Sequence, residues 1–274
     1  MTGAADDAVT LERHDGVGVI GLNRPHAANC VDRALAAGLR DAVIRCAEDD
    51  AVRVVLIRAD GPFFCAGGDI NAFAAAGPDI AVLVDDLTRD LHDALARLQH
   101  MPKPVITAVQ GAAAGAGFGI ALAGDLVVAA KSASFRLAYS AVGLTPDAGA
   151  TWILPRLVGH RLAQEIALLN PKLSADEALD CGLITRVVDD DALDTTVDEI
   201  VQRLAKGSLA ALGATRRLIN DGLARSFEEQ LQAEATAIAA AAGGHDGQEG
   251  IAAFLAKRSP VFAQTVGQAA GGKS

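Results

Sequence analysis

The chain has few aromatic residues and no paired cysteines. Its 274 residues include one tryptophan, one tyrosine and eight phenylalanines, although half of all residues are hydrophobic and alanine is abundant. The four cysteines form no CxxC pair and fit no metal-site spacing. We therefore expect no metal site, and we expect the cysteines to be reduced and mostly buried, as in a cytoplasmic protein.

Long apolar runs and excess positive charge are also missing. The apolar stretches stop well short of the roughly 20 residues that a membrane helix needs, and the first residues lack the basic segment of a secretory signal. The net charge is −10, which disfavours a nucleic-acid partner. The composition predicts a globular cytoplasmic protein without a membrane or nucleic-acid partner, in which local basic residues would have to meet any anionic ligand.

Hydrophobic periodicity predicts an α/β fold, because buried strands alternate with helices as far as about residue 190. Beyond that point only helical patterns follow. We place a boundary near residue 205, between an α/β core of residues 1–205 and a helical region of residues 206–274, with a disordered tail from Gln264. The expected strands are Val9–Arg13, Val17–Leu22, Val52–Ile57, Pro104–Val109, Asp125–Ala130 and Leu183–Val188. The expected helices are Val31–Glu48, Ala81–Leu98, Gly115–Ala123, a short one after Ser174, Asp191–Ala205, Leu209–Gly222, Phe227–Ala242 and Gln248–Lys257.

Two glycine-rich segments follow expected strands, and both could hold negative charge. One is the Ala66–Asp69 turn, and the other is Gly111–Gly119, which opens a buried helix. Glycine lets a ligand approach the main chain closely, and free N–H groups at a helix start favour anions. The first could instead be an ordinary turn, and the second could serve close helix packing. A dinucleotide site is disfavoured because the glycines do not fit GxGxxG.

Two further segments could carry chemistry. Asp147 lies in a loop between Pro146 and small residues, where an aspartate is usually a turn former or a helix cap. The last expected helix ends in Lys257-Arg258. Basic residues there suit the helix dipole, and they could also hold a phosphate group.

Taken in order, these segments resemble the crotonase superfamily, also called the enoyl-CoA hydratase/isomerase family. The resemblance runs from about Val9 to Phe262. It includes Leu22-Asn23-Arg24-Pro25, Lys103-Pro104-Val105-Ile106 and both glycine-rich segments. It implies a crotonase-like spiral of ββα units with a helical C-terminal region, assembly as a homotrimer or a dimer of trimers, and an acyl-CoA thioester as substrate with no other cofactor.

The resemblance also implies site residues. The backbone N–H groups of Gly68 and Ala116 would bind the thioester oxygen as it becomes an enolate. Residues Phe254 and Lys257 would come from the C-terminal helix, often that of a neighbouring subunit. The full set implied for binding coenzyme A and the acyl group is Ala27, Asn29, Ala66, Asp69, Ile70, Tyr139, Phe254 and Lys257. Asn71 replaces a phosphate-binding lysine of some members.

The sequence departs from the hydratases of this family at both catalytic glutamates, which fall on Gly119 and Tyr139. Asp147 matches the acidic residue of the isomerase branch, and its surroundings are most similar to the 1,2-epoxyphenylacetyl-CoA isomerases. One base can remove a proton and return it to another carbon. The resemblance therefore implies an isomerase in which Asp147 is the proton shuttle.

Three alternatives stay open at this point. The chain could be a hydratase in the generic sense, or a non-catalytic acyl-CoA binder with a pocket widened at Gly119. It could also resemble the 4-chlorobenzoyl-CoA dehalogenases, with Asp147 as nucleophile and His92 as base, although a histidine on an amphipathic helix more often has a structural role. By position, the residues expected to line the acyl pocket are Phe73, Phe118, Leu137 and Tyr139.

Overall fold

Two β-sheets form the framework of the computed structural model, which describes residues 7–262. The larger sheet has the strand order β1-β2-β3-β5-β7-β10, and the smaller one has the order β4-β6-β8-β9. Apart from the β1–β2 hairpin, the neighbouring strands of the larger sheet run parallel. Its strands are β1 (Val9–His14), β2 (Val17–Leu22), β3 (Val54–Ala59), β5 (Val105–Val109), β7 (Leu126–Ala130) and β10 (Arg186–Val188). Those of the smaller sheet are β4 (Phe63–Cys65), β6 (Ala112–Ala114), β8 (Ser134–Arg136) and β9 (Leu173–Ser174).

The chain repeats a ββα unit, in which one strand joins each sheet and a helix follows. Thus β3 and β4 precede α2 and α3, β5 and β6 precede α4, and β7 and β8 precede α5. This arrangement confirms the predicted crotonase-like α/β fold. The helices are α1 (Arg33–Glu48), α2 (Ile70–Ala76), α3 (Ile80–His100), α4 (Ala116–Ala121), α5 (Ala150–Val158), α6 (His160–Leu169), α7 (Ala175–Asp180), α8 (Leu193–Ala205), α9 (Leu209–Gly222), α10 (Phe227–Gly243) and α11 (His245–Leu255). Short 3-10 helices are η1 (Pro25–Ala27), η2 (Gly77–Asp79), η3 (Tyr139–Val142) and η4 (Asp190–Ala192).

The larger sheet is covered on both faces, which explains the continuous apolar runs of its strands. Alternate residues of β3 point to opposite sides, because side chains alternate along a strand. Val55 and Ile57 join the main core with α1, α3 and α4, while Val54 and Leu56 join a second cluster with Val197 and the rest of the apolar face of α8. Hydrophobic burial thus fixes the sheet between two helical layers.

Local signals set several helix boundaries. Asp32 caps α1 by accepting a hydrogen bond from the Leu35 N–H, so the helix begins at Arg33 rather than at Val31. The capping box expected at Ser174 is present, with Glu177 as its partner. The strand expected over Val52–Ile57 lies two residues further along, at Val54–Ala59. The expected tail from Gln264 falls outside the described residues.

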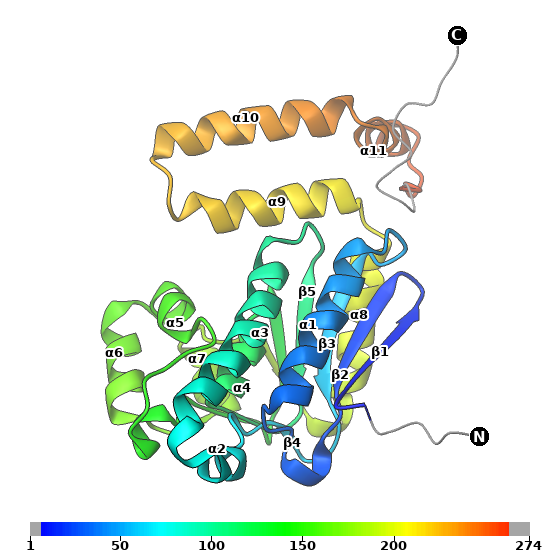
Figure 1. Ribbon diagram of the computed structural model, residues 1–274. Coiled ribbons are helices and arrows are strands. Elements are labelled where there is room, and N and C mark those ends of the chain that lie inside the picture. The colour runs from blue at the N-terminus through cyan, green and yellow to red at the C-terminus, as the bar shows by residue number, and fades with distance from the viewer. Residues whose placement is uncertain (1–6, 263–274) are drawn as a thin grey trace, which may run out of the picture.

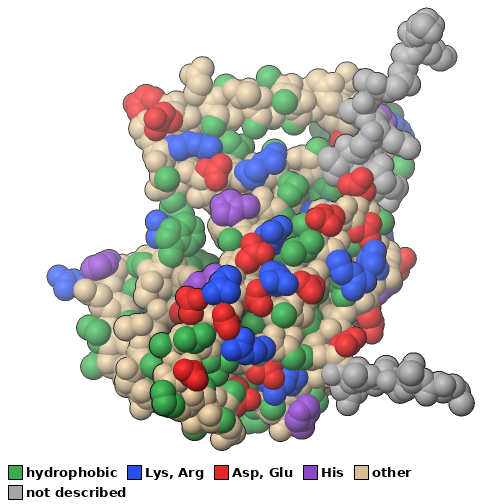
Figure 2. Space-filling model, in the orientation of Figure 1, with side chains coloured by type: hydrophobic (Ala, Val, Ile, Leu, Met, Phe, Trp, Pro, Cys, Tyr) green, Lys and Arg blue, Asp and Glu red, His purple; other side chains and the backbone are tan. Residues whose placement is uncertain are grey.

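Helices α9, α10 and α11 stand away from the sheets, with α10 farthest from them (Figure 1). None of the α10 residues is buried. By contrast, acidic and basic side chains are interspersed over the face that carries α1 and α3 (Figure 2), where Arg33 pairs with Asp86. The division of the chain at residue 205 stays a prediction. Within residues 7–262, no helix is long and apolar enough to cross a membrane.

Candidate active site

The Ala66–Asp69 turn lies beside the turn that follows β6 within the Gly111–Gly119 segment, because the strands before these two turns are parallel neighbours. Strand β4 pairs with β6 in the smaller sheet, so the turns that follow their carboxyl ends meet at one edge. Gly67 has a φ of +98°, and a Cβ there would lie 3.0 Å from the Ala114 carbonyl oxygen and 3.3 Å from Gly115 Cα. Only glycine fits such a contact, so the sequence of the first turn is dictated by its approach to the second.

Each turn presents one free backbone donor. Val31 brackets the first turn, since its N–H donates to the Gly67 carbonyl at 2.7 Å and its carbonyl accepts from the Asp69 N–H at 3.1 Å. The Gly68 N–H between them has no acceptor among the described residues. Ala116 is the first residue of α4, so its N–H has no intrahelical acceptor, and the described residues supply no other. The structure therefore brings together the two predicted donors.

Both donors open onto a cavity of about 370 Å³. Its walls are largely apolar, and Asp147 is the only acid among the described residues that line it. The hydroxyl of Thr88 is already used, because it donates to the Asp85 carbonyl of its own helix at 3.1 Å. The lining residues are Val31, Ala66, Gly67, Gly68, Ile70, Phe73, Val84, Leu87, Thr88, Leu91, Gly115, Ala116, Ala138, Tyr139, Val142, Leu144, Thr145 and Asp147.

The carboxylate of Asp147 lies between an aromatic hydroxyl and an imidazole. Tyr139 donates a hydrogen bond from its hydroxyl to Oδ1 of Asp147, and Nε2 of His92 lies 3.4 Å from Oδ2. The Ala148 N–H also donates to Nε2 of His92 at 3.2 Å. Burial, followed by the nearby Asp147 carboxylate, raises the pKa of Tyr139. Tyr139 consequently keeps its proton and acts as the donor.

Gly119, where hydratases of the family carry a glutamate, has no room for a side chain. A Cβ there would lie 2.5 Å from both the Cβ and the carbonyl oxygen of Ala148. The expectation of a pocket widened at Gly119 is therefore wrong, because Ala148 fills that space. Tyr139, at the position of the second glutamate, lines the cavity as expected.

The expected acyl-pocket residues are only partly correct. Phe73 and Tyr139 line the cavity, whereas Phe118 and Leu137 are buried in the main core. Their apolar side chains are drawn into the protein interior, so they do not reach the cavity. The walls that sequence reasoning missed come from α3 and the loop after η3, as with Leu87 and Leu144. Leu87 could have been predicted as a buried residue, since it belongs to the apolar stripe of its helix.

Only some of the residues that were predicted to contact coenzyme A line the cavity. Ala66 and Ile70 line it, but Ala27, Asn29 and Asp69 do not. Asn29 is 0% exposed, and its side chain binds the main chain of Arg24, Asp60 and Phe63. The Asp69 carboxylate caps α2 by accepting from the Asn71 and Ala72 N–H groups. The side chains of Asn29 and Asp69 thus hold the first turn in place.

Phe254 and Lys257 lie far along the chain, in α11 and just after it, and do not line this cavity. Phe254 is 84% exposed. The structure therefore leaves both residues outside the site of the same chain.

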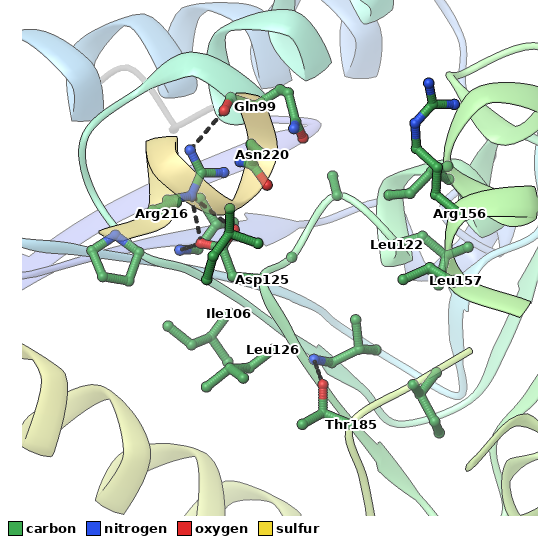
Figure 3. Close-up of a pocket in the computed structure, with 18 of the residues that line it drawn as sticks. Gln99, Ile106, Leu122, Asp125, Leu126, Arg156, Leu157, Thr185, Arg216 and Asn220 are labelled. Carbon is green, nitrogen blue, oxygen red and sulfur yellow. Dashed lines mark hydrogen bonds and ion pairs between the residues drawn. The ribbon is translucent and has the colours of Figure 1, made fainter. Parts of the chain in front are cut away.

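Two larger cavities, of about 630 and 670 Å³, lie beside α9. Neither is lined by Gly68, Ala116 or Asp147, although His92 and Gly119 form part of the wall of the second. The first is drawn in Figure 3, where Arg216 of α9 reaches Asp125 and the Gln99 carbonyl. Two of its charged side chains, Arg216 and Asp125, are thereby already paired. Among residues 7–262, no group of three or more histidine, cysteine, aspartate or glutamate side chains could hold a metal ion.

Comparison with known proteins agrees with this geometry. The family model described as "Enoyl-CoA hydratase/isomerase" matches residues 12–265. The chain is 40% identical over 251 residues to "1,2-epoxyphenylacetyl-CoA isomerase" of Escherichia coli (strain K12), covering 90% of this chain and 95% of the other. It is 30% identical over 277 residues to "4-chlorobenzoyl coenzyme A dehalogenase-2" of Arthrobacter sp, covering 100% of both.

The fold agrees with solved structures as well. The crystal structure of an enoyl-CoA hydratase from Polaromonas sp. JS666 superimposes with a TM-score of 0.89 at 32% identity, covering 93% of this chain and 99% of the other. The match to the family model spans nearly the whole sequence. This chain belongs to the enoyl-CoA hydratase/isomerase family.

Proposed function

We propose that this protein is an acyl-CoA isomerase that moves a proton between two carbons of its substrate through an enolate. One observation carries the proposal. Asp147 is the only acid among the described residues lining a cavity that also holds the free N–H groups of Gly68 and Ala116. One base and one oxyanion site are sufficient for a proton shuttle, whereas hydration needs groups that activate and deliver water.

The proposed reaction balances without an oxidant or a second reactant. Asp147 removes a proton from a carbon of the acyl chain, and the C–H electrons move toward the thioester oxygen. The N–H groups of Gly68 and Ala116 stabilise the resulting enolate by about 3–4 kcal/mol for each donor. Asp147 then returns the proton to a different carbon. The step requires no metal or redox cofactor, and coenzyme A enters only as part of the substrate.

The walls of the cavity favour an apolar acyl group. Six leucine and valine side chains and Phe73 form most of the lining, and of the two threonines there, Thr88 donates its hydroxyl to its own helix. The resemblance to a 1,2-epoxyphenylacetyl-CoA isomerase supports an acyl group of this kind. We place coenzyme A against the first turn, near Ala27, Asn29, Ala66, Asp69 and Ile70.

The substitution Asp147→Asn tests the proposal. With 3-hexenoyl-CoA as the probe, the rate of conversion to the conjugated 2-enoyl product should fall about 100- to 10,000-fold, the usual contribution of a general base. Asp93→Asn is the matched control, because Asp93 pairs with Arg97 on the exposed side of α3 and is outside the cavity. Undiminished isomerisation by Asp147→Asn would remove Asp147 from the mechanism.

Two other functions make different predictions. A hydratase would add water to crotonyl-CoA at an ordinary rate, although Gly119 admits no glutamate. A non-catalytic binder would hold acyl-CoA tightly in a calorimeter without converting any thioester in a panel. Turnover that depends on Asp147 would exclude the binder.

Dehalogenation is the second candidate, and the contact between His92 and Asp147 favours it. Asp147 would attack the ring carbon, chloride would leave, and water would hydrolyse the resulting ester with His92 as base. The Ala148 N–H, however, donates to Nε2 of His92, which occupies the lone pair that the base would use. Chloride release from 4-chlorobenzoyl-CoA by the wild type, lost in His92→Gln, would favour this reaction over isomerisation.

We also propose that the protein assembles as a homotrimer or a dimer of trimers. The C-terminal helices expose large apolar side chains that no part of the described chain covers, namely Phe227, Leu231 and Ile238 of α10 and Ile251, Phe254 and Leu255 of α11. In such an assembly, Phe254 and Lys257 would reach the coenzyme A bound to a neighbouring copy. This would explain why both lie outside the cavity of their own chain.

A further inference from the structure

The orientation of the Asp147 carboxylate depends on the side chains around it, because the residue lies in a loop. The residue stands between Pro146 and Ala148, and the latter has a φ of +50°. A side chain on such a loop can rotate unless it is held by partners. Here Oδ1 accepts the hydroxyl proton of Tyr139, and Oδ2 faces Nε2 of His92 at 3.4 Å.

Tyr139 is itself fixed by its backbone. Ala138 before it has a φ of +65°, and its N–H donates to Oδ1 of the buried Asn170 at 2.7 Å. The Tyr139 carbonyl accepts from the Leu144 N–H at 3.0 Å. The aromatic ring therefore enters the cavity from an anchored point, which lets its hydroxyl fix another group.

The hydrogen bond has a defined direction. Tyr139 keeps its proton, because burial and the Asp147 carboxylate raise its pKa. His92, from α3, is the other titratable group that faces Asp147, and no lysine or arginine is among the described residues that line the cavity. Nε2 of His92 accepts a hydrogen bond from the Ala148 N–H at 3.2 Å. Tyr139 is therefore the side chain that donates to Asp147.

We propose that Tyr139 is a positioning residue that holds Asp147 in the orientation needed for proton transfer. This inference rests on the proposed function, in which Asp147 is the base. During the reaction the substrate C–H bond breaks, the proton goes to the Asp147 carboxylate, and a second C–H bond forms at another carbon. The O–H bond of Tyr139 stays intact throughout. The hydroxyl uses one lone pair of Oδ1 and leaves the others for the substrate.

Kinetics of Tyr139→Phe test this role. Loss of a hydrogen bond to a charged group should lower kcat for 3-hexenoyl-CoA by about 10- to 100-fold. KM should change by less than about threefold, because the ring that lines the cavity remains. An unchanged melting temperature would show that the variant folds normally.

A double-mutant cycle separates the two proposals. In an Asp147→Asn background, the further change Tyr139→Phe should have no effect on kcat, because Tyr139 acts through Asp147. A large loss in Asp147→Asn with a normal kcat in Tyr139→Phe would overturn the role of Tyr139 alone. Full activity of Asp147→Asn would overturn the proposed function itself.

Discussion

Gly119 leaves no room for the glutamate that hydratases of the family carry at this position. The residue lies in α4, where Ala148 of the Asp147 loop packs against its backbone. The loop that carries the proposed base thus occupies the space that a hydratase glutamate would need. A gain of hydratase activity would require this loop to move, and with it Asp147.

We predict that Gly119→Glu destabilises the protein and does not create a hydratase. Forcing extra atoms into a filled site costs about 1–3 kcal/mol, and for a chain of this size each kcal/mol lowers the melting temperature by roughly 2–4 °C. Scanning calorimetry and a crotonyl-CoA hydration assay measure the two effects. Hydration at an ordinary rate by Gly119→Glu would show that the Asp147 loop moves aside to admit the glutamate, and would contradict the prediction.

A pair of glycine-to-alanine changes provides the control for this prediction. Gly119→Ala should lower the melting temperature, because its Cβ meets Ala148. Gly243→Ala should not, since a Cβ at that end of α10 has nothing within 4 Å. Equal effects of the two changes would rule out the steric explanation.

At the scale of elements, the strands of the larger sheet were predictable and those of the smaller one were not. The sheet that is buried on both faces needs apolar runs, and β2 was located to the residue at Val17–Leu22. Strands β4, β6 and β8 have three residues each, too few to display a period of two. Only the repeat of the ββα unit could have indicated them.

The candidate site was predictable where local chemistry dictates it. The glycines at 67 and 115 follow from the close contact of two turns, whereas the Gly68 and Ala116 donors were assigned from the resemblance to the family. The bond between Tyr139 and Asp147 was not foreseen, because it depends on the left-handed backbone at Ala138 and on the distant Asn170. The spacing of residues in the sequence does not predict a contact of this kind.

Arg216 attaches α9 to the core, and this contact leads to a prediction about stability. Arg216 is only 7% exposed. It pairs with Asp125 and donates to the carbonyls of Leu98, Gln99 and Met101, all at 2.7 Å. It thereby satisfies the end of α3 and fixes α9 to the core. Arg216→Met should cost about 3–5 kcal/mol, because it removes the cation that pairs with Asp125 and the donor that serves three carbonyls.

Urea unfolding followed by circular dichroism measures that cost. Arg217→Met, a change of the same chemistry at the next and exposed position of α9, is the matched control and should alter the free energy of unfolding by less than about 0.5 kcal/mol. Equal stability of the two variants would contradict the anchoring role of Arg216.

For the whole molecule, charge and exposed apolar area favour assembly. The chain carries 34 acidic and 24 basic residues, so its overall field repels the phosphates of coenzyme A. Within one copy, Lys257 lies outside the cavity. Assembly would bring this cation to a neighbouring cavity and would also cover the apolar residues of α10 and α11. Assembly would thus supply a cation for the coenzyme A phosphates and would bury the exposed apolar side chains, neither of which the single chain achieves.

Ile238 of α10, 69% exposed, is the position at which we test assembly. Ile238→Asp should convert the proposed oligomer into smaller species, because a buried and unpaired carboxylate costs several kcal/mol at each interface. Sedimentation velocity at micromolar protein measures this. Gln232→Asp adds the same charge to the same helix at a polar position and should leave the assembly intact. The dissociated variant should also show a raised KM for acyl-CoA, because each cavity loses the Phe254 and Lys257 of its neighbour. A wild type that sediments as a monomer would contradict the assembly, and would leave the coenzyme A phosphates to be met by other residues.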